Sequence, residues 1–587
     1  MQWASFALAT LFAGKSLVTA QTWCGKNYMR NQTIVPPGGR FPKPGESSSP
    51  LLTFRCSQTI RPYLPHDTTN SPTVLVSSWI SNTSYPDSVE WTPPPGFPGP
   101  FESRKPHCVA SGSIPEIPTG SDPDQGRNQV VKDYYELPLD LGKLQPQKEH
   151  YTLEFRCPTF LSFPGNEIGS VTKMDGRSGA LLVQSNEGPG RFKEIFPIGF
   201  YTQFNNYLTN LTVLSDLKNQ GSDRVLDEME KLGLYLMYDM RWTVNSEVNS
   251  IKKRPNLLLW YTADEPDGTS DPLDVTTKSY NLINSLDGGD NSGGSGYHPV
   301  SLVLNCQDYQ FTPYASGADI IMTDVYPIGN NVTFSEPWGT ECTPDYGDCG
   351  CDNCKGSLRD ISDRLEDYRE RLYANGWHYT KALWSVPQGF GNQSYWKRHP
   401  TGKEFIAQSV LAINYGAKGL ISWTDPTTAS IKSAAANLTK GLESMTPYLL
   451  SHSHDSAQVS AAVWTTTSGS LLTAVNLGPD RLSIKLDLTY PFILAPNKDQ
   501  AMFSAVDQVL GEGRGANAFV SQEDGGQKYF VSATYELDGF ESGAWIYTGL
   551  LAGEDGGGEN NSVSLKTARL LETVLCGAIV LVLLNAM

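Results

Sequence analysis

The sequence predicts an α/β fold whose centre is a (β/α)8 barrel of the TIM type, with β-rich domains on both sides. Between residues 191 and 450, short apolar runs alternate with amphipathic stretches. Such alternation over about 250 residues has the rhythm and the size of one barrel. The segments before and after it carry short alternating runs bounded by Gly, Pro and Ser, without helical periodicity. With 587 residues, 39% of them hydrophobic, the chain is long enough for several folded domains.

Both ends of the chain have the character of targeting signals. Residues 1–20 contain an apolar run, so we expect a signal peptide cleaved after Ala20; a buried N-terminal helix is the alternative. A flexible stalk over 549–560 precedes a polar spacer and an apolar tail, which together form a 561–587 propeptide for a glycosylphosphatidylinositol anchor attached at Asn560. A plain tail anchor is the alternative. These signals predict a secreted protein held at the outer face of the plasma membrane, or in the cell wall.

The cysteines and the glycosylation sequons agree with export. Cys306 stands alone between two groups of four: Cys24, Cys56, Cys108 and Cys157, and Cys342, Cys349, Cys351 and Cys354. We expect two disulfides within each group and a free, buried thiol at Cys306. A metal site in the second group is disfavoured because its spacing is not that of paired C-x2-C zinc ligands, and no cofactor is expected. N-glycosylation is expected at Asn31, Asn82, Asn210, Asn331, Asn392 and Asn437.

Two flanking domains follow from the short alternating segments. Residues 21–190 are expected to form one disulfide-bearing β-rich domain, and residues 451–548 a C-terminal antiparallel β-domain. The net charge of -17 argues against non-specific binding of nucleic acid, which needs clustered Lys and Arg. Nothing in the sequence indicates an oligomeric state.

Seven strands of the barrel can be placed in the sequence. They are expected at 195–203, 234–240, 256–262, 300–305, 320–326, 382–388 and 419–424. Between them, amphipathic helices are expected at 226–232, 357–375 and 404–416. The second strand of the barrel is missing, because no room for it remains between the helix expected to end near Gly221 and the helix capped by Ser222 or Asp223. Either another element replaces this strand, or the gene product has lost it, or the sequence is mispredicted there; an incomplete barrel would expose two strand edges.

The most informative stretch is 256–267, an apolar strand that ends in aromatic and acidic residues. In barrels of this type the chemistry lies at the carboxyl ends of the strands. Pro266 disfavours helical backbone at Glu265, so we expect Glu265 to be extended and to hold its carboxyl at the strand tip. Nearby aromatic side chains can desolvate a carboxyl and favour its neutral form, which a general acid needs.

This stretch resembles the fourth-strand motif of clan A (β/α)8 glycoside hydrolases, where a strand ends in Asn-Glu-Pro or a variant. Residues 196–201 and 238–242 resemble the first and third strands of related proteins. With its terminal signals, the chain resembles secreted, anchored hydrolases of the fungal type. The resemblance implies that Glu265 is the acid/base. Two positions depart from it: Asp264 stands where Asn is usual, and the seventh strand has Gln388 and no Glu where the nucleophile is expected.

Asp324 is the expected second carboxyl, because it ends an apolar strand and is followed by Val-Tyr-Pro. A carboxyl separation of about 5 to 5.5 Å would make it a nucleophile, and one of about 6.5 to 9.5 Å an inverting base. Substrate-binding side chains are expected at Trp260, Tyr261, Asp239, Tyr326, Trp384, Gln388, Trp423 and Asp425. The alternative is that the aromatic residues fill a packed barrel interior and that Asp264 and Asp425 cap helices.

The sequence therefore favours a cell-surface glycoside hydrolase or transglycosylase that acts on a polysaccharide or glycan. The alternative is a non-catalytic carbohydrate-binding or cell-wall structural protein on a degenerate barrel, suggested by the missing strand and the missing seventh-strand Glu. A Ser/His/Asp hydrolase is disfavoured because the chain has no G-x-S-x-G motif.

Overall fold

The computed structural model describes most of the chain between residues 22 and 549. The described ranges are 22–30, 39–64, 73–92, 135–138, 151–152, 158–159, 168–184, 190–202, 222–240, 245–288, 296–450, 454–456, 461–466, 469–490, 503–511, 514–522 and 529–549. The predicted signal peptide, the propeptide and the stalk apart from Gly549 lie outside these ranges. So does 203–221, which leads up to the junction near Gly221 where the barrel's second strand was expected to be missing.

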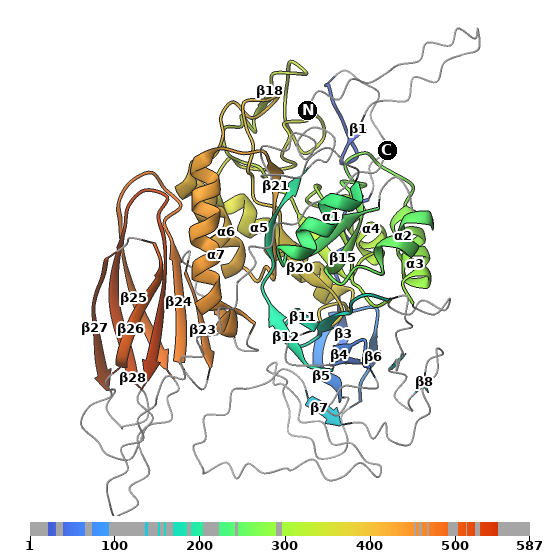
Figure 1. Ribbon diagram of the computed structural model, residues 1–587, viewed down its shortest axis with the longest axis horizontal. Helices are drawn as coiled ribbons and strands as arrows, with labels where there is room; N and C mark the ends of the chain where they lie inside the picture. Colours follow the sequence, from blue (N-terminus) through green and yellow to red (C-terminus); the bar gives the residue numbers. More distant parts are fainter. Residues whose placement is uncertain are drawn as a thin grey trace, which may run out of the picture.

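Seven parallel strands form the sheet at the centre of the molecule (Figure 1). Their spatial order is β13 (Ile198–Thr202), β21 (Leu420–Asp425), β20 (Ala382–Ser385), β17 (Ile320–Thr323), β16 (Val300–Leu304), β15 (Leu257–Asp264) and β14 (Leu236–Asp239). The first of these strands in the sequence pairs with the last, as the closure of a (β/α)8 barrel requires. Among the described residues, β13 and β14 form the two edges of this sheet. The predicted fold class is confirmed.

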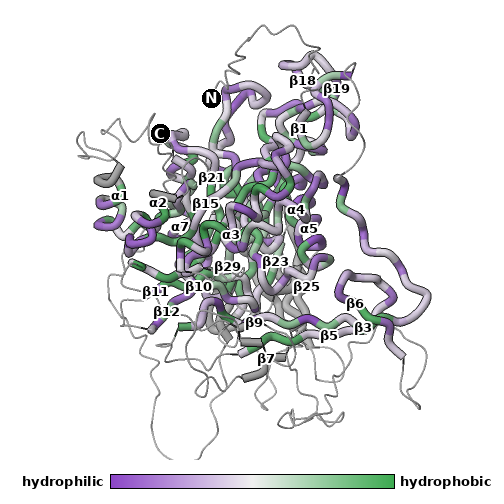
Figure 2. Tube along the Cα trace, turned by 90° about the vertical axis from the view of Figure 1, so that its right-hand side faces the viewer, coloured by the Kyte–Doolittle hydropathy of each residue, from purple (hydrophilic) through white to green (hydrophobic). Residues whose placement is uncertain are grey.

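Helices follow the strands and cover the outside of the sheet. They are α1 (Ser222–Lys231), α2 (Asn245–Ile251), α3 (Val275–Leu286), α4 (Phe311–Ser316), α5 (Arg359–Ala374), α6 (Gly402–Asn414) and α7 (Ala429–Leu449). In α6 a capping box forms, because Thr401 accepts from the Glu404 N–H and the Glu404 side chain accepts from the Thr401 N–H. Figure 2 shows apolar residues on the central strands and polar ones on outer helix surfaces. Within the described ranges, no helix combines the length and apolarity needed to cross a bilayer.

The strands alternate between two cores, and this alternation decides which side chains face the barrel interior. Along β17, Ile320 and Met322 pack into the interior, whereas Ile321 packs against the helices. Because side chains alternate along a strand, Asp324 continues the inward-facing row. Along β15, Tyr261 belongs to the interior and Trp260 to the helix side. A strand end thus delivers only every second side chain to the barrel interior.

Antiparallel sheets flank the barrel, as predicted. The N-terminal part has one sheet of β6 (Ser88–Glu90), β3 (Gly45–Gln58), β5 (Thr73–Ser84) and β7 (Tyr135–Pro138), and another of β12 (Phe192–Ile195), β11 (Leu181–Gln184), β10 (Thr172–Asp175) and β4 (Ile60–Arg61). The C-terminal part has β22 (His454–Ser456), β23 (Ala461–Thr466), β24 (Gly469–Val475), β29 (Ser542–Gly549) and β26 (Phe503–Leu510) in one sheet, and β25 (Leu482–Tyr490), β28 (Tyr529–Leu537) and β27 (Arg514–Gln522) in another. The five-stranded sheet shares a hydrophobic core with α6 and α7.

The disulfides differ in part from the prediction. Cys342–Cys349 and Cys351–Cys354 pair within the second group, as expected. Cys24, however, is bonded to Cys306, so the predicted free thiol at Cys306 is wrong and the first group cannot form two bridges of its own. Cys56 is also in a disulfide, and Cys108 and Cys157 lie outside the described ranges. The spacing of cysteines does not reveal which of them the folded chain brings together.

The glycosylation sequons within the described ranges are accessible. Asn82, Asn331, Asn392 and Asn437 all have exposed side chains, whereas Asn31 and Asn210 lie outside the described residues. Modification at these positions remains a prediction.

Candidate active site

The turn after β15 brings Glu265 to the end of the strand in an unusual backbone conformation. Its φ is 51°, in the left-handed region, so the expectation of an extended backbone is wrong. The turn accounts for this conformation, because the Glu265 carbonyl accepts N–H groups from Gly268 at 3.0 Å and Thr269 at 3.2 Å. Its own N–H donates to the Val303 carbonyl at 3.1 Å. Non-glycine residues in such conformations cost about 1 kcal/mol or more and gather at functional sites.

Glu265 and Asp324 form a hydrogen-bonded carboxyl pair. Asp324 follows β17 and is 4% exposed, whereas Glu265 is only partly buried. Asn305, at the end of β16 between them, donates its amide nitrogen to Glu265 Oε1 at 2.9 Å and to Asp324 Oδ1 at 3.3 Å. The structure therefore brings the two predicted carboxyls together and adds an amide that contacts both.

The surroundings favour the protonated form of this pair. Burial first, and then the charges of Asp264, Asp267 and Asp348, raise the pKa of Glu265 to about 7, although the hydrogen bond with Asp324 acts in the opposite direction. Burial and the neighbouring Glu265 raise the pKa of Asp324 well above its ordinary value. Because two carboxyls in contact do not readily ionise together, the pair retains one shared proton near neutral pH.

Asp267 is a third buried carboxyl, and it holds the chain around the pair. Its side chain is 1% exposed and accepts N–H groups from Gly268 at 3.0 Å, Asn305 at 3.2 Å and Cys306 at 2.8 Å. Burial raises the pKa of Asp267 to about 7, while these N–H donors act in the opposite direction. Arg364 donates to the Asn305 carbonyl. Asp267 and Arg364 together fix the backbone of Asn305.

Sequence reasoning missed Asn305 as a functional residue. Its one sequence signal is its position at the end of the 300–305 strand, the same barrel end as Glu265 and Asp324. An amide at a strand end can equally be structural, so its role depends on the contacts made in the folded chain.

Several predicted substrate-binding residues share the barrel interior with the pair. Tyr261 donates its hydroxyl to Asp264 Oδ1 at 2.6 Å, and Tyr201 donates to Asp239 Oδ2 at 3.4 Å. Trp423 stacks on Tyr201, with ring centroids 4.2 Å apart, and remains partly buried. Tyr326 lies close enough for the charges of Asp324 and Glu265 to act on it; burial first, and then these charges, raise its pKa.

Four other predicted binding residues are buried or already engaged by protein groups, so substrate binding at these positions remains a prediction. Trp260 is fully buried and faces the helix side, because its neighbour Tyr261 faces inward. Trp384 is also fully buried. Gln388 is buried with its amide engaged by the Ile328 N–H and by the Ile328 and Phe390 carbonyls. Asp425 pairs with Lys432 at 2.9 Å.

The fold and the site define a (β/α)8-type barrel protein with a carboxyl pair at the carboxyl ends of its parallel strands. Within the part of the chain that the structure describes, no group of three His, Cys, Asp or Glu side chains is placed to hold a metal ion. No family model matches the chain, and neither does any curated protein.

Among solved structures, the chain shows weak similarity to carbohydrate-active enzymes. A debranching enzyme from Nostoc punctiforme has 9% identity over 49% of this chain and 57% of its own, with a TM-score of 0.27. A GH27 β-L-arabinopyranosidase from Geobacillus stearothermophilus has 12% identity over 52% and 60%, with a TM-score of 0.25. An Anoxybacillus α-amylase has 13% identity over 55% and 72%, with a TM-score of 0.27. The chain spans less than two thirds of the first two. Similarity this low does not transfer a function, which must be inferred from the chain's own residues.

Proposed function

We propose that the protein is a glycoside hydrolase or transglycosylase acting on a polysaccharide or glycan, with Glu265 as acid/base and Asp324 as the second carboxyl. The hydrogen-bonded pair, contacted on both sides by Asn305, carries this proposal. Glycosidic cleavage needs one protonated and one ionised carboxyl. A pair that retains one proton near neutral pH supplies both forms once the shared proton, which the hydrogen bond favours on Asp324 in the free protein, moves to Glu265.

The exposure and contact of the two groups support separate roles. Glu265 is the more exposed and can reach a leaving-group oxygen, whereas Asp324 is buried below it. Retaining enzymes hold their carboxyls about 5 to 5.5 Å apart, and inverting enzymes leave about 6.5 to 9.5 Å for a water. Because Glu265 Oε1 and Asp324 Oδ1 lie 2.9 and 3.3 Å from the same Asn305 nitrogen, they are closer than the inverting separation, and we propose retention. Asp324 attacks the anomeric carbon as Glu265 protonates the departing oxygen; Glu265 then removes a proton from the water or sugar hydroxyl that displaces Asp324.

We also propose that the protein works outside the cell, anchored by lipid through Asn560 at the plasma membrane or in the wall. The disulfides support an oxidising compartment, because such bonds are rare in the cytosol. The exposed side chains at four sequons are consistent with glycosylation on the same route.

The experiment compares Glu265→Gln and Asp324→Asn on a polysaccharide panel and on aryl glycosides whose leaving group needs no protonation. Both variants should lose polysaccharide cleavage by about 100-fold or more. Glu265→Gln should still release the activated aryl group, because only the acid is missing, whereas Asp324→Asn should not. The matched control is Asp271→Asn, the same change at an exposed carboxyl nearby, which should behave as wild type.

Undiminished turnover in Glu265→Gln would exclude the proposed chemistry. Glycan binding without any product, unchanged in Glu265→Gln, would instead assign a non-catalytic carbohydrate-binding protein.

A further inference from the structure

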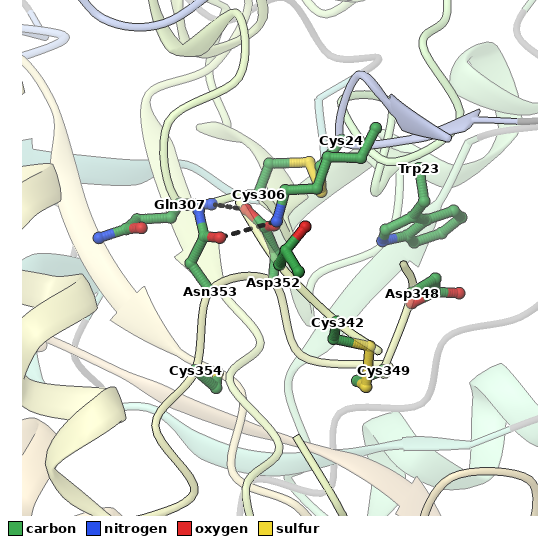
Figure 3. Close-up of polar contacts among 12 residues, drawn as sticks. Trp23, Cys24, Cys306, Gln307, Cys342, Asp348, Cys349, Asp352, Asn353 and Cys354 are labelled. Carbon is green, nitrogen blue, oxygen red and sulfur yellow. Dashed lines mark hydrogen bonds and ion pairs between the residues drawn. A yellow bond between two sulfur atoms is a disulfide. The ribbon is translucent and has the colours of Figure 1, made fainter. Parts of the chain in front are cut away.

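The N-terminal segment 22–30 lies at the carboxyl ends of β15 and β16, because it contacts Gly268 and Cys306, which follow these strands. Figure 3 shows Cys24 beside Cys306. Its hairpin pairs β1 (Thr22–Trp23) with β2 (Lys26–Asn27). The Cys24 N–H donates to the Gly268 carbonyl at 3.2 Å, and its sulfur is bonded to Cys306. Lys26 pairs with Asp352 at 2.5 Å and donates to Asn353 Oδ1 at 2.7 Å. A covalent bond, a backbone hydrogen bond and an ion pair therefore fix this segment beside Asn305.

Trp23 determines which way the Asn305 amide points. Its indole N–H donates to Asn305 Oδ1 at 3.0 Å. An indole N–H can only donate, so the amide oxygen must face Trp23. The amide nitrogen is then left to face Glu265 and Asp324. Because the two ends of an Asn amide have nearly the same shape, hydrogen-bond partners and not packing decide between the two orientations.

Close packing holds the Trp23 ring in place. A Cβ added at Gly268 would lie 2.5 Å from Trp23 Cζ2, so the ring occupies the space that only glycine leaves open. On the other side, Asp267 and Arg364 hold the Asn305 backbone but not its amide. Among the described contacts of the Asn305 side chain, Trp23 supplies the donor N–H that faces its oxygen.

We propose that Trp23 is a positioning residue: held by the Cys24–Cys306 disulfide, its indole N–H orients the Asn305 amide so that it donates to both Glu265 and Asp324. The effect of Trp23 on the ionisation of Glu265 and Asp324 does not require a substrate, whereas any effect of Trp23 on turnover rests on the proposed function. An amide N–H favours the charged form of a carboxyl. Without Trp23 the amide can turn its oxygen toward the pair, which disfavours that charge.

The experiment titrates the full-length protein without substrate, using infrared difference spectroscopy. The signal of the pair is identified as the carboxyl band that Glu265→Gln removes. In Trp23→Phe, which keeps an aromatic ring but loses the N–H, the apparent pKa of the pair should rise by about one pH unit. The matched control is Trp79→Phe, the same change on β5, where the ring contacts Arg55 and Tyr373. It should leave the titration unchanged.

A double-mutant cycle separates positioning from a general structural effect. Asn305→Ala alone should raise the pKa, and Trp23→Phe should add nothing in that background, because it acts through Asn305. Gly268→Ala should also break the hydrogen bond from Trp23 to Asn305 while leaving the indole chemically intact, because the added Cβ displaces the ring. It also serves if Trp23→Phe fails to fold. An unchanged pKa in folded Trp23→Phe and Gly268→Ala would overturn the proposal, and so would additive shifts in the double variant.

The failure of this inference can be told from failure of the proposed function. If the pKa shifts occur in a protein that cleaves no glycan, the positioning role stands and the glycosidase proposal falls. If cleavage depends on Glu265 and Asp324 while Trp23→Phe leaves both the pKa and kcat unchanged, the positioning role falls alone.

Discussion

The indole N–H of Trp23 donates to Asn305 Oδ1 at 3.0 Å across 282 positions of sequence. Through the amide of Asn305, the first described residues of the chain contact a carboxyl pair built on strands in its middle. The disulfide between Cys24 and Cys306, the residues that follow each partner of this hydrogen bond, holds the contact. The candidate site therefore depends on a segment outside the barrel.

Glycan cleavage should fall at alkaline pH, where the pair loses the shared proton that it retains near neutral pH and that the leaving group needs. Asp264→Asn removes a negative charge that raises the pKa of Glu265 and keeps an oxygen for the Tyr261 hydroxyl. In Asp264→Asn, the fall of kcat/KM on the alkaline side of the pH profile should therefore occur at lower pH than in the wild type. The measurement is the pH profile of kcat/KM for both proteins. An alkaline limb that does not move would show that another group controls it.

Stability should also fall as pH rises. Glu265 and Asp267 each have a pKa of about 7 in the folded protein, against ordinary values of 4.5 and 3.8. At pH values between the ordinary and the folded pKa of each group, the carboxyl is protonated in the folded protein but ionised in the unfolded chain. Their stabilising contribution is complete below the ordinary values and is lost as pH rises through 7. The thermal midpoint, measured from about pH 5 to about pH 8, should decline, and Glu265→Gln should flatten the decline. A midpoint that rises over this range in wild type would contradict the prediction.

Asp267→Ala should destabilise the fold by about 1–3 kcal/mol, because three N–H groups lose their acceptor. The measurement is urea unfolding at acid and neutral pH. Asp271→Ala, at an exposed side chain, should change the free energy of unfolding by less than about 0.5 kcal/mol. Equal effects of the two changes would argue against the role assigned to Asp267.

Replacing both Cys24 and Cys306 by Ser should lower the free energy of unfolding by about 2–4 kcal/mol and raise the pKa of the pair as Trp23→Phe does. The bond links residues 282 positions apart, so it restricts the unfolded chain strongly. Serine at Cys342 and Cys349, which are separated by only 7 positions, should cost less and leave the pair unaffected. Thermal melts and the substrate-free titration measure the two effects.

Gly419→Ala tests the conclusion that Trp384 is a core residue. A Cβ there would lie 2.4 Å from Trp384 Cδ2, so overpacking should cost about 1–3 kcal/mol. Gly45→Ala, where a Cβ meets no atom within 4 Å, is the control. Glycan binding at a temperature where both variants are folded should be unchanged. A large loss of glycan binding in Gly419→Ala would instead indicate that Trp384 contacts the substrate.

The sequence by itself was sufficient for the barrel strands, the flanking β-sheets and the two carboxyls. These features are local: an apolar run of strand length predicts a buried strand, and a carboxyl after it marks the carboxyl end of that strand. Glu265 and Asp324 could be named because both end such runs. Two disulfides within the second cysteine group were also predicted, since its members are close in sequence, but which of its cysteines pair was decided by the fold.

Only the tertiary structure decided which groups meet around those carboxyls. Whether Trp260 faces the barrel interior or the helices depends on which side chains of the alternating row in β15 point inward. The left-handed backbone of Glu265 depends on the turn that follows β15. The roles of Trp23, Cys306 and Asn305 depend on the path of the N-terminal segment across the barrel end. Local patterns report how a segment is buried, whereas contacts between distant side chains arise from the whole fold, and these contacts set the ionisation of the pair.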